Sequence, residues 1–198
     1  MILAASANIK VFATGGVGGV HLDAEKTFDV SADLQELAQT PVTVISAGPK
    51  AILDLPKTLQ VLETLGVPVV TFGQDELPAF WSRSSGLRSP IRMNSAEEIA
   101  RSQLIREALS IPGGQLVANP IPAYAEIPFQ EILPIIKKAH LEANKENISD
   151  KNLTPFLLEK VFNLTDGASL NANIELVKNN ASLACKVASS LITEKSRL

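Results

Sequence analysis

The stretch Thr14–His21, TGGVGGVH, contains four glycines and follows the apolar run Ile9–Ala13. The apolar run predicts a short buried strand. Glycines gathered directly after a strand indicate that the chain turns sharply there or approaches another group closely. A strand that leads through such a loop into the predicted helix Ala32–Gln39 is typical of an α/β fold. The loop is therefore the natural place to look for a ligand.

The composition describes a globular chain of one domain. The 198 residues are 45% hydrophobic and 20% charged, which is enough apolar material for a core. The net charge of −3 gives no electrostatic case for binding nucleic acid or an anionic membrane. The apolar runs are also too short to predict a membrane-spanning helix. The single cysteine, Cys185, rules out an internal disulfide, and its helical pattern predicts a buried position.

Predicted strands and helices alternate along the chain. We expect Ser31 to cap the first long helix and Pro56 to bend or divide the second. Residues 73–94 read as a loop. We predict one three-layer α/β/α domain over residues 1–198, in which a mixed central sheet lies between two layers of helices. The predicted strands are Ile9–Ala13, Val42–Ser46, Val67–Phe72 and Gln115–Asn119, and the later helices are Ser95–Leu109, Phe129–Lys145, Thr154–Leu164 and Ser169–Thr193.

Three features of the first fifty residues carry chemistry, and each has a plainer alternative. The glycine loop with Thr14 can bind a phosphate through its backbone, or it can simply form a tight turn. Asp29 and Asp33 offer oxygen ligands for Mg²⁺ or Mn²⁺, or they cap and flank a helix. Lys50 follows a strand and a Gly-Pro turn, where it is either an amine nucleophile or a surface lysine. The residue types leave the role of His21 open.

Longer motifs make the chain recognisable. These are VFATGGVGGVH, TFDVSADLQELAQTPVTVISAGPKAILD, LPAFWSRSSG, NPIP and SLNANIELVKNNASLA. Together they resemble the pseudouridine-5′-phosphate glycosidase family, also called indigoidine synthase A-like, over nearly the whole chain. The resemblance implies an enzyme that reversibly splits the C–C glycosidic bond of pseudouridine 5′-phosphate into uracil and ribose 5-phosphate. A carbon leaving group does not suit hydrolysis by two carboxylates, and the family uses a lysine imine instead.

The resemblance assigns roles to individual residues. Lys50 falls on the imine-forming lysine, and Asp29 on the residue that holds a divalent metal, usually Mn²⁺. Asn173 falls on the asparagine that reads the uracil edge. The residues implied to contact the substrate are Thr14, Gly15, Gly16, Ser31, Ala32, Asp33 and Asn173.

The resemblance also implies a homotrimer and exposes differences. Met1 falls inside a family helix, so we expect the N-terminal third of the domain, with its glutamate acid/base, to be missing. Leu22 stands where an arginine is common. The alternative function is therefore a catalytically inactive isoform that binds sugar phosphate or assembles with full-length subunits.

The last three residues, Ser196-Arg197-Leu198, are a close variant of the Ser-Lys-Leu peroxisomal address. They predict a peroxisomal protein, with the cytoplasm as the alternative location.

Overall fold

The computed structural model describes residues 1–149 and 152–196. In these residues five strands form one sheet in the order β1-β2-β5-β3-β4, and every neighbouring pair is parallel. The prediction of a mixed sheet is therefore wrong. The physical reason is that the connections from β1 to β2, from β2 to β3 and from β4 to β5 each contain a helix, which returns the chain to the same edge of the sheet. The strands are β1 (Val11–Ala13), β2 (Thr43–Ser46), β3 (Val69–Phe72), β4 (Ile91–Met93) and β5 (Gln115–Ala118).

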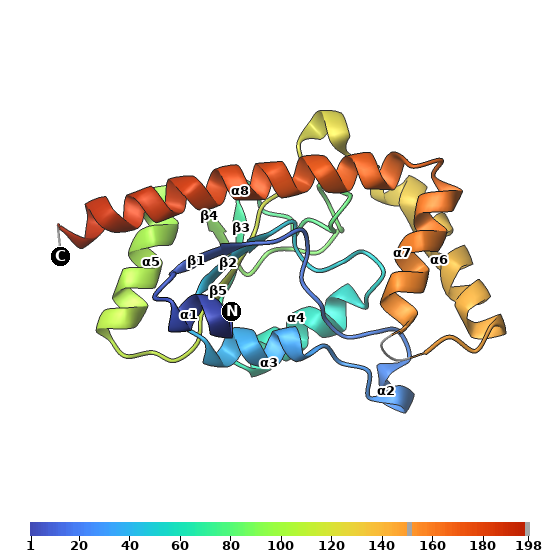
Figure 1. The fold of residues 1–198 in the computed structure, drawn as a ribbon, viewed down its shortest axis with the longest axis horizontal. Helices are drawn as coiled ribbons and strands as arrows, with labels where there is room; N and C mark the ends of the chain where they lie inside the picture. Colours follow the sequence, from blue (N-terminus) through green and yellow to red (C-terminus); the bar gives the residue numbers. More distant parts are fainter. Residues whose placement is uncertain (150–151, 197–198) are drawn as a thin grey trace.

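Helices cover both faces of the sheet, which confirms the three-layer prediction (Figure 1). Val44 of β2 faces the layer formed by α3 (Ala32–Gln39) and α4 (Leu55–Thr64). The next residue, Ile45, faces the layer formed by α5 (Ala96–Ala108) and α8 (Ala168–Lys195). This alternation follows from the two-residue period of a strand, and both faces are apolar because both are buried.

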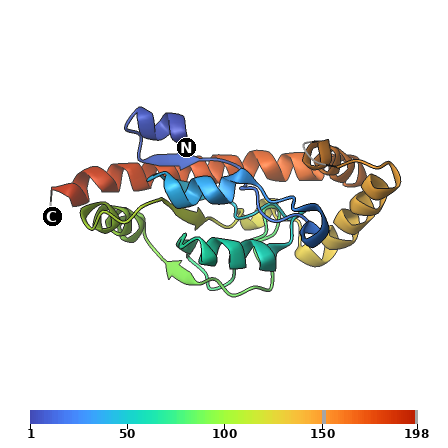
Figure 2. The ribbon, with the colours of Figure 1, turned by 90° about the horizontal axis from the view of Figure 1, so that it is seen from below.

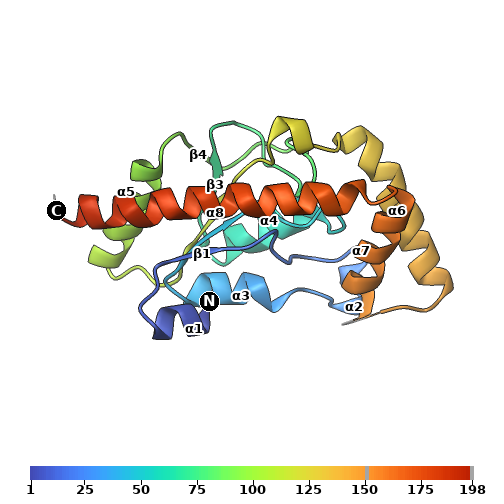
Figure 3. The ribbon, with the colours of Figure 1, turned by 45° about the horizontal axis from the view of Figure 1, so that its top comes forward.

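The remaining helices lie around this central unit. Figure 2 shows α1 beside β1, on the side of the molecule where the N-terminus lies. Figure 3 shows α6 and α7 together at one end of α8. These elements are α1 (Ile2–Ser6), α2 (Ala24–Thr27), the 3₁₀ helix η1 (Ala123–Ala125), α6 (Phe129–Lys145) and α7 (Leu153–Leu164).

Three local predictions are corrected by the structure. Pro56 lies in the first turn of α4, where its missing N–H costs no hydrogen bond, so the helix begins there and does not bend. Cys185 is exposed because it lies on the outward side of α8, between the buried residues Leu183 and Val187. The segment predicted as loop contains β4, a short and largely exposed edge strand with little apolar pattern to reveal it.

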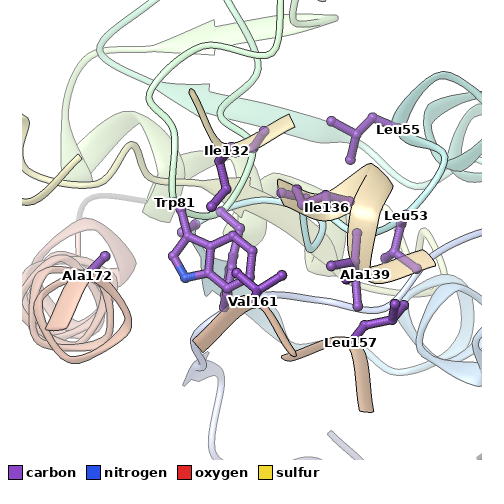
Figure 4. Packing of buried hydrophobic residues seen from close by; sticks show 14 of the residues in the cluster. Leu53, Leu55, Trp81, Ile132, Ile136, Ala139, Leu157, Val161 and Ala172 are labelled. Carbon is purple, nitrogen blue, oxygen red and sulfur yellow. The ribbon is translucent and has the colours of Figure 1, made fainter. Parts of the chain in front are cut away.

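A second apolar cluster lies beyond the carboxyl ends of the strands (Figure 4). Ile132 and Ile136 of α6 and Val161 of α7 pack there around Trp81. The indole Nε1–H of Trp81 donates a 3.1 Å hydrogen bond to a backbone carbonyl at the start of α8. This cluster also contains residues 51–53, so it supports the loop that follows β2.

Helix α8 is the longest helix in the described residues, yet no helix there is both long and apolar enough to cross a membrane. Of the predicted peroxisomal address, Arg197 and Leu198 lie outside the described residues.

Candidate functional site

Two loops run side by side at the carboxyl ends of β1 and β2. We call residues 14–21 the glycine loop and residues 47–54 the lysine loop. Ala47 N–H donates to the Gly15 carbonyl at 2.8 Å, and Val17 N–H donates to the Gly48 carbonyl at 3.2 Å. Lys50 N–H then donates to the Val17 carbonyl at 3.1 Å. Both segments therefore lie at the same edge of the sheet. Ligands in parallel α/β sheets commonly bind at this edge.

The glycines of this loop make room for neighbouring side chains. Their backbone φ angles are ones that any residue adopts, whereas Gly48 in the lysine loop has a φ of +86°. A Cβ atom on Gly16 would lie 2.5 Å from the Phe80 ring. At three positions an added Cβ would collide with a side chain from elsewhere in the chain: with Phe80 at Gly16, with Ser31 at Gly18 and with Thr58 at Gly19. Close packing therefore explains why these positions carry glycine, whether or not a phosphate binds there.

The Ser31–Asp33 segment supports the glycine loop from the α3 side. Ser31 caps α3, as predicted, by accepting a 3.2 Å hydrogen bond from Asp33 N–H. The Ser31 N–H donates to the Gly19 carbonyl at 2.9 Å. The Asp33 carboxylate accepts a 2.7 Å hydrogen bond from Gly18 N–H. Ala32, the first residue of α3, is exposed. The three predicted substrate contacts of this segment thus lie beside the glycine loop, and two of them hold its backbone.

Asp29 and His21 face one another across the same region. The His21 N–H donates to the Asp29 carbonyl at 3.0 Å, and the Asp29 carboxylate lies 3.8 Å from Nδ1 of His21. Burial lowers the pKa of His21; Asp29 opposes this and the charge of Lys50 adds to it. The imidazole is therefore neutral at neutral pH. Within residues 1–149 and 152–196, its buried Nδ1 has no hydrogen-bond partner.

The metal prediction rests on a sparse set of donors. Among the described residues, no three His, Cys, Asp or Glu side chains come together to hold an ion. At Asp29 the neighbouring donor is Nδ1 of His21, 3.8 Å from the carboxylate and without a hydrogen-bond partner among the described residues. Small divalent cations such as Mg²⁺ keep several waters and bind through one or two carboxylates. Two protein donors fit a cation that keeps water at most of its coordination positions, and they are too few for a site in which every ligand comes from the protein.

Four of the predicted site residues line two separate hollows, and Lys50 lines neither of them. Thr14, Gly16 and Asp33 line a cavity of about 290 Å³ between β1 and α3. Asp29 lines another, of about 170 Å³, together with His140 of α6. The Nε2 of His140 lies 2.9 Å from the Ile52 carbonyl in the lysine loop. Since a carbonyl only accepts, Nε2 carries the proton.

Helix α8 brings asparagines to the glycine loop. The Oδ1 of Asn173 is buried without a partner in the described chain and lies 3.5 Å from the position of a Cβ on Gly15. The Nδ2 of Asn180 donates to the Thr14 carbonyl at 2.8 Å, and its Oδ1 accepts from Asn119 at 3.1 Å. Sequence reasoning missed Asn180 and Asn119. The seven-residue spacing of Asn173 and Asn180, two helical turns on one face, was the available signal.

These features define an α/β protein with a lysine, acidic residues and a glycine loop at the carboxyl edge of a parallel sheet. The profile of the family described as "Indigoidine synthase A like protein" matches residues 1–190. The chain belongs to this family.

Two curated relatives are named pseudouridine-5′-phosphate glycosidase. The protein from Jannaschia sp. is 64% identical over 98% of this chain, and that from Paracoccus denitrificans is 61% identical over 98%. The chain spans 64% of the length of each of these relatives.

Two crystal structures are similar to this fold. A prealnumycin C-glycosynthase in complex with ribulose 5-phosphate has a TM-score of 0.93 at 30% identity, covering 100% of this chain and 65% of its own. An indigoidine synthase A-like protein from Thermotoga maritima has a TM-score of 0.86 at 37% identity, covering 94% of this chain and 61% of its own.

Proposed function

We propose that this chain is the lysine-bearing part of a pseudouridine-5′-phosphate glycosidase, which reversibly cleaves the C–C glycosidic bond to give uracil and ribose 5-phosphate. The observation that carries the proposal is the 64% identity, over 98% of the chain, to a relative of that name. The structure supports it because Lys50 lies on a loop hydrogen-bonded to the glycine loop at the carboxyl edge of the sheet. The similar C-glycosynthase structure holds a pentose phosphate, which is the same class of ligand.

In the proposed reaction Lys50 is the nucleophile. Its amine, once deprotonated, forms a bond to C1′ while the ring C1′–O4′ bond breaks and O4′ takes a proton. The nitrogen lone pair then forms the C=N double bond as the C1′–C5 bond to uracil breaks and C5 is protonated. Water adds to the imine carbon, which releases ribose 5-phosphate and the free amine. The amine bonded to C1′ makes this feasible, because its nitrogen lone pair drives the loss of a carbon leaving group and the imine is the product of that step.

The neighbouring residues have proposed binding roles. Thr14, with the backbone at Gly15 and Gly16, would bind the phosphate, and the Ser31–Asp33 segment would bind the sugar. Asn173 would pair with the uracil edge, since an amide offers both an acceptor and donors. Its Oδ1, which is buried and has no hydrogen-bond partner among the described residues, supports this role.

Asp29 is the proposed ligand of Mn²⁺, which would supply positive charge beside the substrate when bound. The Asp29–His21 pair described above is the support for this assignment.

Assembly and location are also proposals. We propose a homotrimer, which sedimentation of the purified chain would test. We propose that Ser196-Arg197-Leu198 directs the protein to peroxisomes, with a cytoplasmic location as the alternative. Imaging a fluorescent fusion with a free C-terminus, and the same fusion with Leu198 deleted, distinguishes the two locations.

Borohydride trapping with ribose 5-phosphate and Mn²⁺, read by intact mass, tests the proposed chemistry. The expected result is one adduct that is lost in Lys50→Ala and retained in Lys26→Ala, a matched change at an exposed lysine. An adduct that survives Lys50→Ala would refute the assignment of the nucleophile. If the folded chain gives no adduct but still binds ribose 5-phosphate, it acts as a sugar-phosphate-binding isoform.

A further inference from the structure

Phe80 holds an unusual backbone conformation next to the candidate site. Its φ of +57° lies in the left-handed region, which disfavours residues that carry a large side chain. Such strained residues persist only where the surrounding structure holds them, and they are often found at functional sites. Phe80 is only 3% exposed, so it is strongly held. The mechanism proposed above gives it no role.

The contacts of Phe80 join the two loops of the site. Its ring lies against Gly16, where an added Cβ would come within 2.5 Å of Cδ2. Its backbone N–H donates a 3.0 Å hydrogen bond to the Ala47 carbonyl, three residues before Lys50. One residue thus touches the middle of the glycine loop through its side chain and the start of the lysine loop through its backbone.

The segment around Phe80 is itself anchored. The carbonyl oxygen of Pro78 lies so close to Gly48 that a Cβ there would come within 2.5 Å of it. The neighbouring Trp81 packs edge-on against the Phe80 ring, with ring centroids 4.9 Å apart. The indole N–H of Trp81 in turn donates a hydrogen bond to the Ser169 carbonyl at the start of α8. The ring of Phe80 is therefore backed by the apolar cluster of Figure 4 and has little freedom to withdraw from Gly16.

We infer that Phe80 is a positioning residue that fixes the glycine loop and the lysine loop relative to one another, and so sets the distance from Lys50 to the bound sugar phosphate. This inference rests on the proposed function for its chemical consequence, but the positioning of the loops is measurable without it. It also gives Gly16 a definite purpose: the missing side chain allows the ring to contact the loop backbone directly.

Phe80→Leu removes the ring while leaving an apolar side chain, and Phe156→Leu is the matched control. Phe156 packs against the same apolar cluster from α7. Hydrogen–deuterium exchange of the folded proteins measures loop order directly. The expected result for Phe80→Leu is faster exchange confined to residues 14–21 and 47–54, with no such change in Phe156→Leu. Unchanged exchange in these loops, or an increase spread evenly over the chain, would overturn the inference.

The chemical consequence is measured by the limiting rate of adduct formation at saturating ribose 5-phosphate. We expect Phe80→Leu to lower this rate by about 10- to 100-fold, because small misplacements of reacting groups are that costly. Phe156→Leu should stay within about 2-fold of the parent, since Phe156 lies on α7 and makes none of the hydrogen bonds or close contacts described above that join the two loops. A merely structural role for Phe80 would lower the folded fraction without changing the limiting rate per folded molecule, and that result would count against positioning.

A double-mutant cycle with Gly16→Ala tests the contact itself. The added methyl group should slow adduct formation strongly when the ring is present and much less in the Phe80→Leu background, so the two changes should not be additive. Strict additivity would refute the ring-to-loop contact. If the parent protein forms no adduct, the proposed function fails, and loop-specific exchange in Phe80→Leu decides the positioning inference alone.

Discussion

Asp33→Ala separates a structural role of this carboxylate from a role in binding substrate. In the structure the Asp33 carboxylate accepts a hydrogen bond of 2.7 Å from the N–H of Gly18, a buried position in the glycine loop. Removing the carboxylate leaves that N–H without its partner. The substitution should therefore destabilise the folded protein even when no substrate is present.

The size of this effect follows from the exposure of the two partners. A hydrogen bond to a charged group contributes about 1.5–3 kcal/mol, but the Asp33 side chain is partly hydrated, which reduces its share to about 1–2 kcal/mol. For a chain of this length that corresponds to a fall in Tm of about 2–8 °C. Asp33 also lies in the first turn of α3, where an acidic residue raises the free energy of unfolding by about 0.3–1 kcal/mol through its interaction with the helix dipole.

Glu97→Ala is the control for the helix-dipole part, because Glu97 occupies the same position in the first turn of α5. Urea unfolding of the parent and both variants measures the free energy of unfolding. We expect Asp33→Ala to lose about 1 kcal/mol or more beyond the loss in Glu97→Ala. Equal losses in the two variants would refute the view that Asp33 holds the glycine loop, and would leave it free for substrate alone.

Three further predictions use unfolding measurements. Gly19→Ala should destabilise the protein by about 1–3 kcal/mol because the new methyl group meets Thr58, and Gly19→Ala in a Thr58→Ser background should recover part of that loss in urea unfolding. Burial lowers the pKa of His140, so as the pH falls this histidine takes up a proton near pH 6.5 in the unfolded chain before it does so in the folded chain. The Tm of the protein should therefore fall as the pH drops from about 7.5 to 5.5, and it should fall less in His140→Gln. An equal pH dependence in both proteins would contradict this assignment. Trp81→Phe should cost about 1 kcal/mol by removing the hydrogen bond that the indole N–H donates to the Ser169 carbonyl, and an unchanged urea midpoint would rule that out.

Much of the fold was predictable from local patterns. The residues of α3 and α6 match the predicted ranges, since Ser31 marks the start of α3 and apolar residues recur with helical spacing along α6. The parallel direction of the strands was harder to predict, because it depends on whether each connection brings the chain back to the end of the sheet where the previous strand began. The edge strand β4 was not predictable, since Ile91 and Arg92 are both exposed and three residues are too few to show alternating hydrophobicity.

The site was predictable in its parts and not in its geometry. The sequence order places Thr14 and Lys50 after neighbouring strands, so their shared edge could be foreseen. The hydrogen bond from Gly18 to Asp33 could not, because it depends on the angle at which α3 leaves its capping turn. The contact of Asn180 with the Thr14 carbonyl joins residues far apart in sequence, and only the packing of α8 across β1 creates it.

A glycine cluster after a strand has two physical meanings that a sequence does not separate. It can free backbone N–H groups for an anion, or it can admit neighbouring side chains to the backbone. Here the second meaning holds at Gly16, Gly18 and Gly19, where added Cβ atoms would meet Phe80, Ser31 and Thr58. The two meanings are compatible, since a loop that is packed against several elements presents its N–H groups in fixed directions. A phosphate site built in this way needs little reorganisation on binding, and this is the property that the proposed imine chemistry at Lys50 requires.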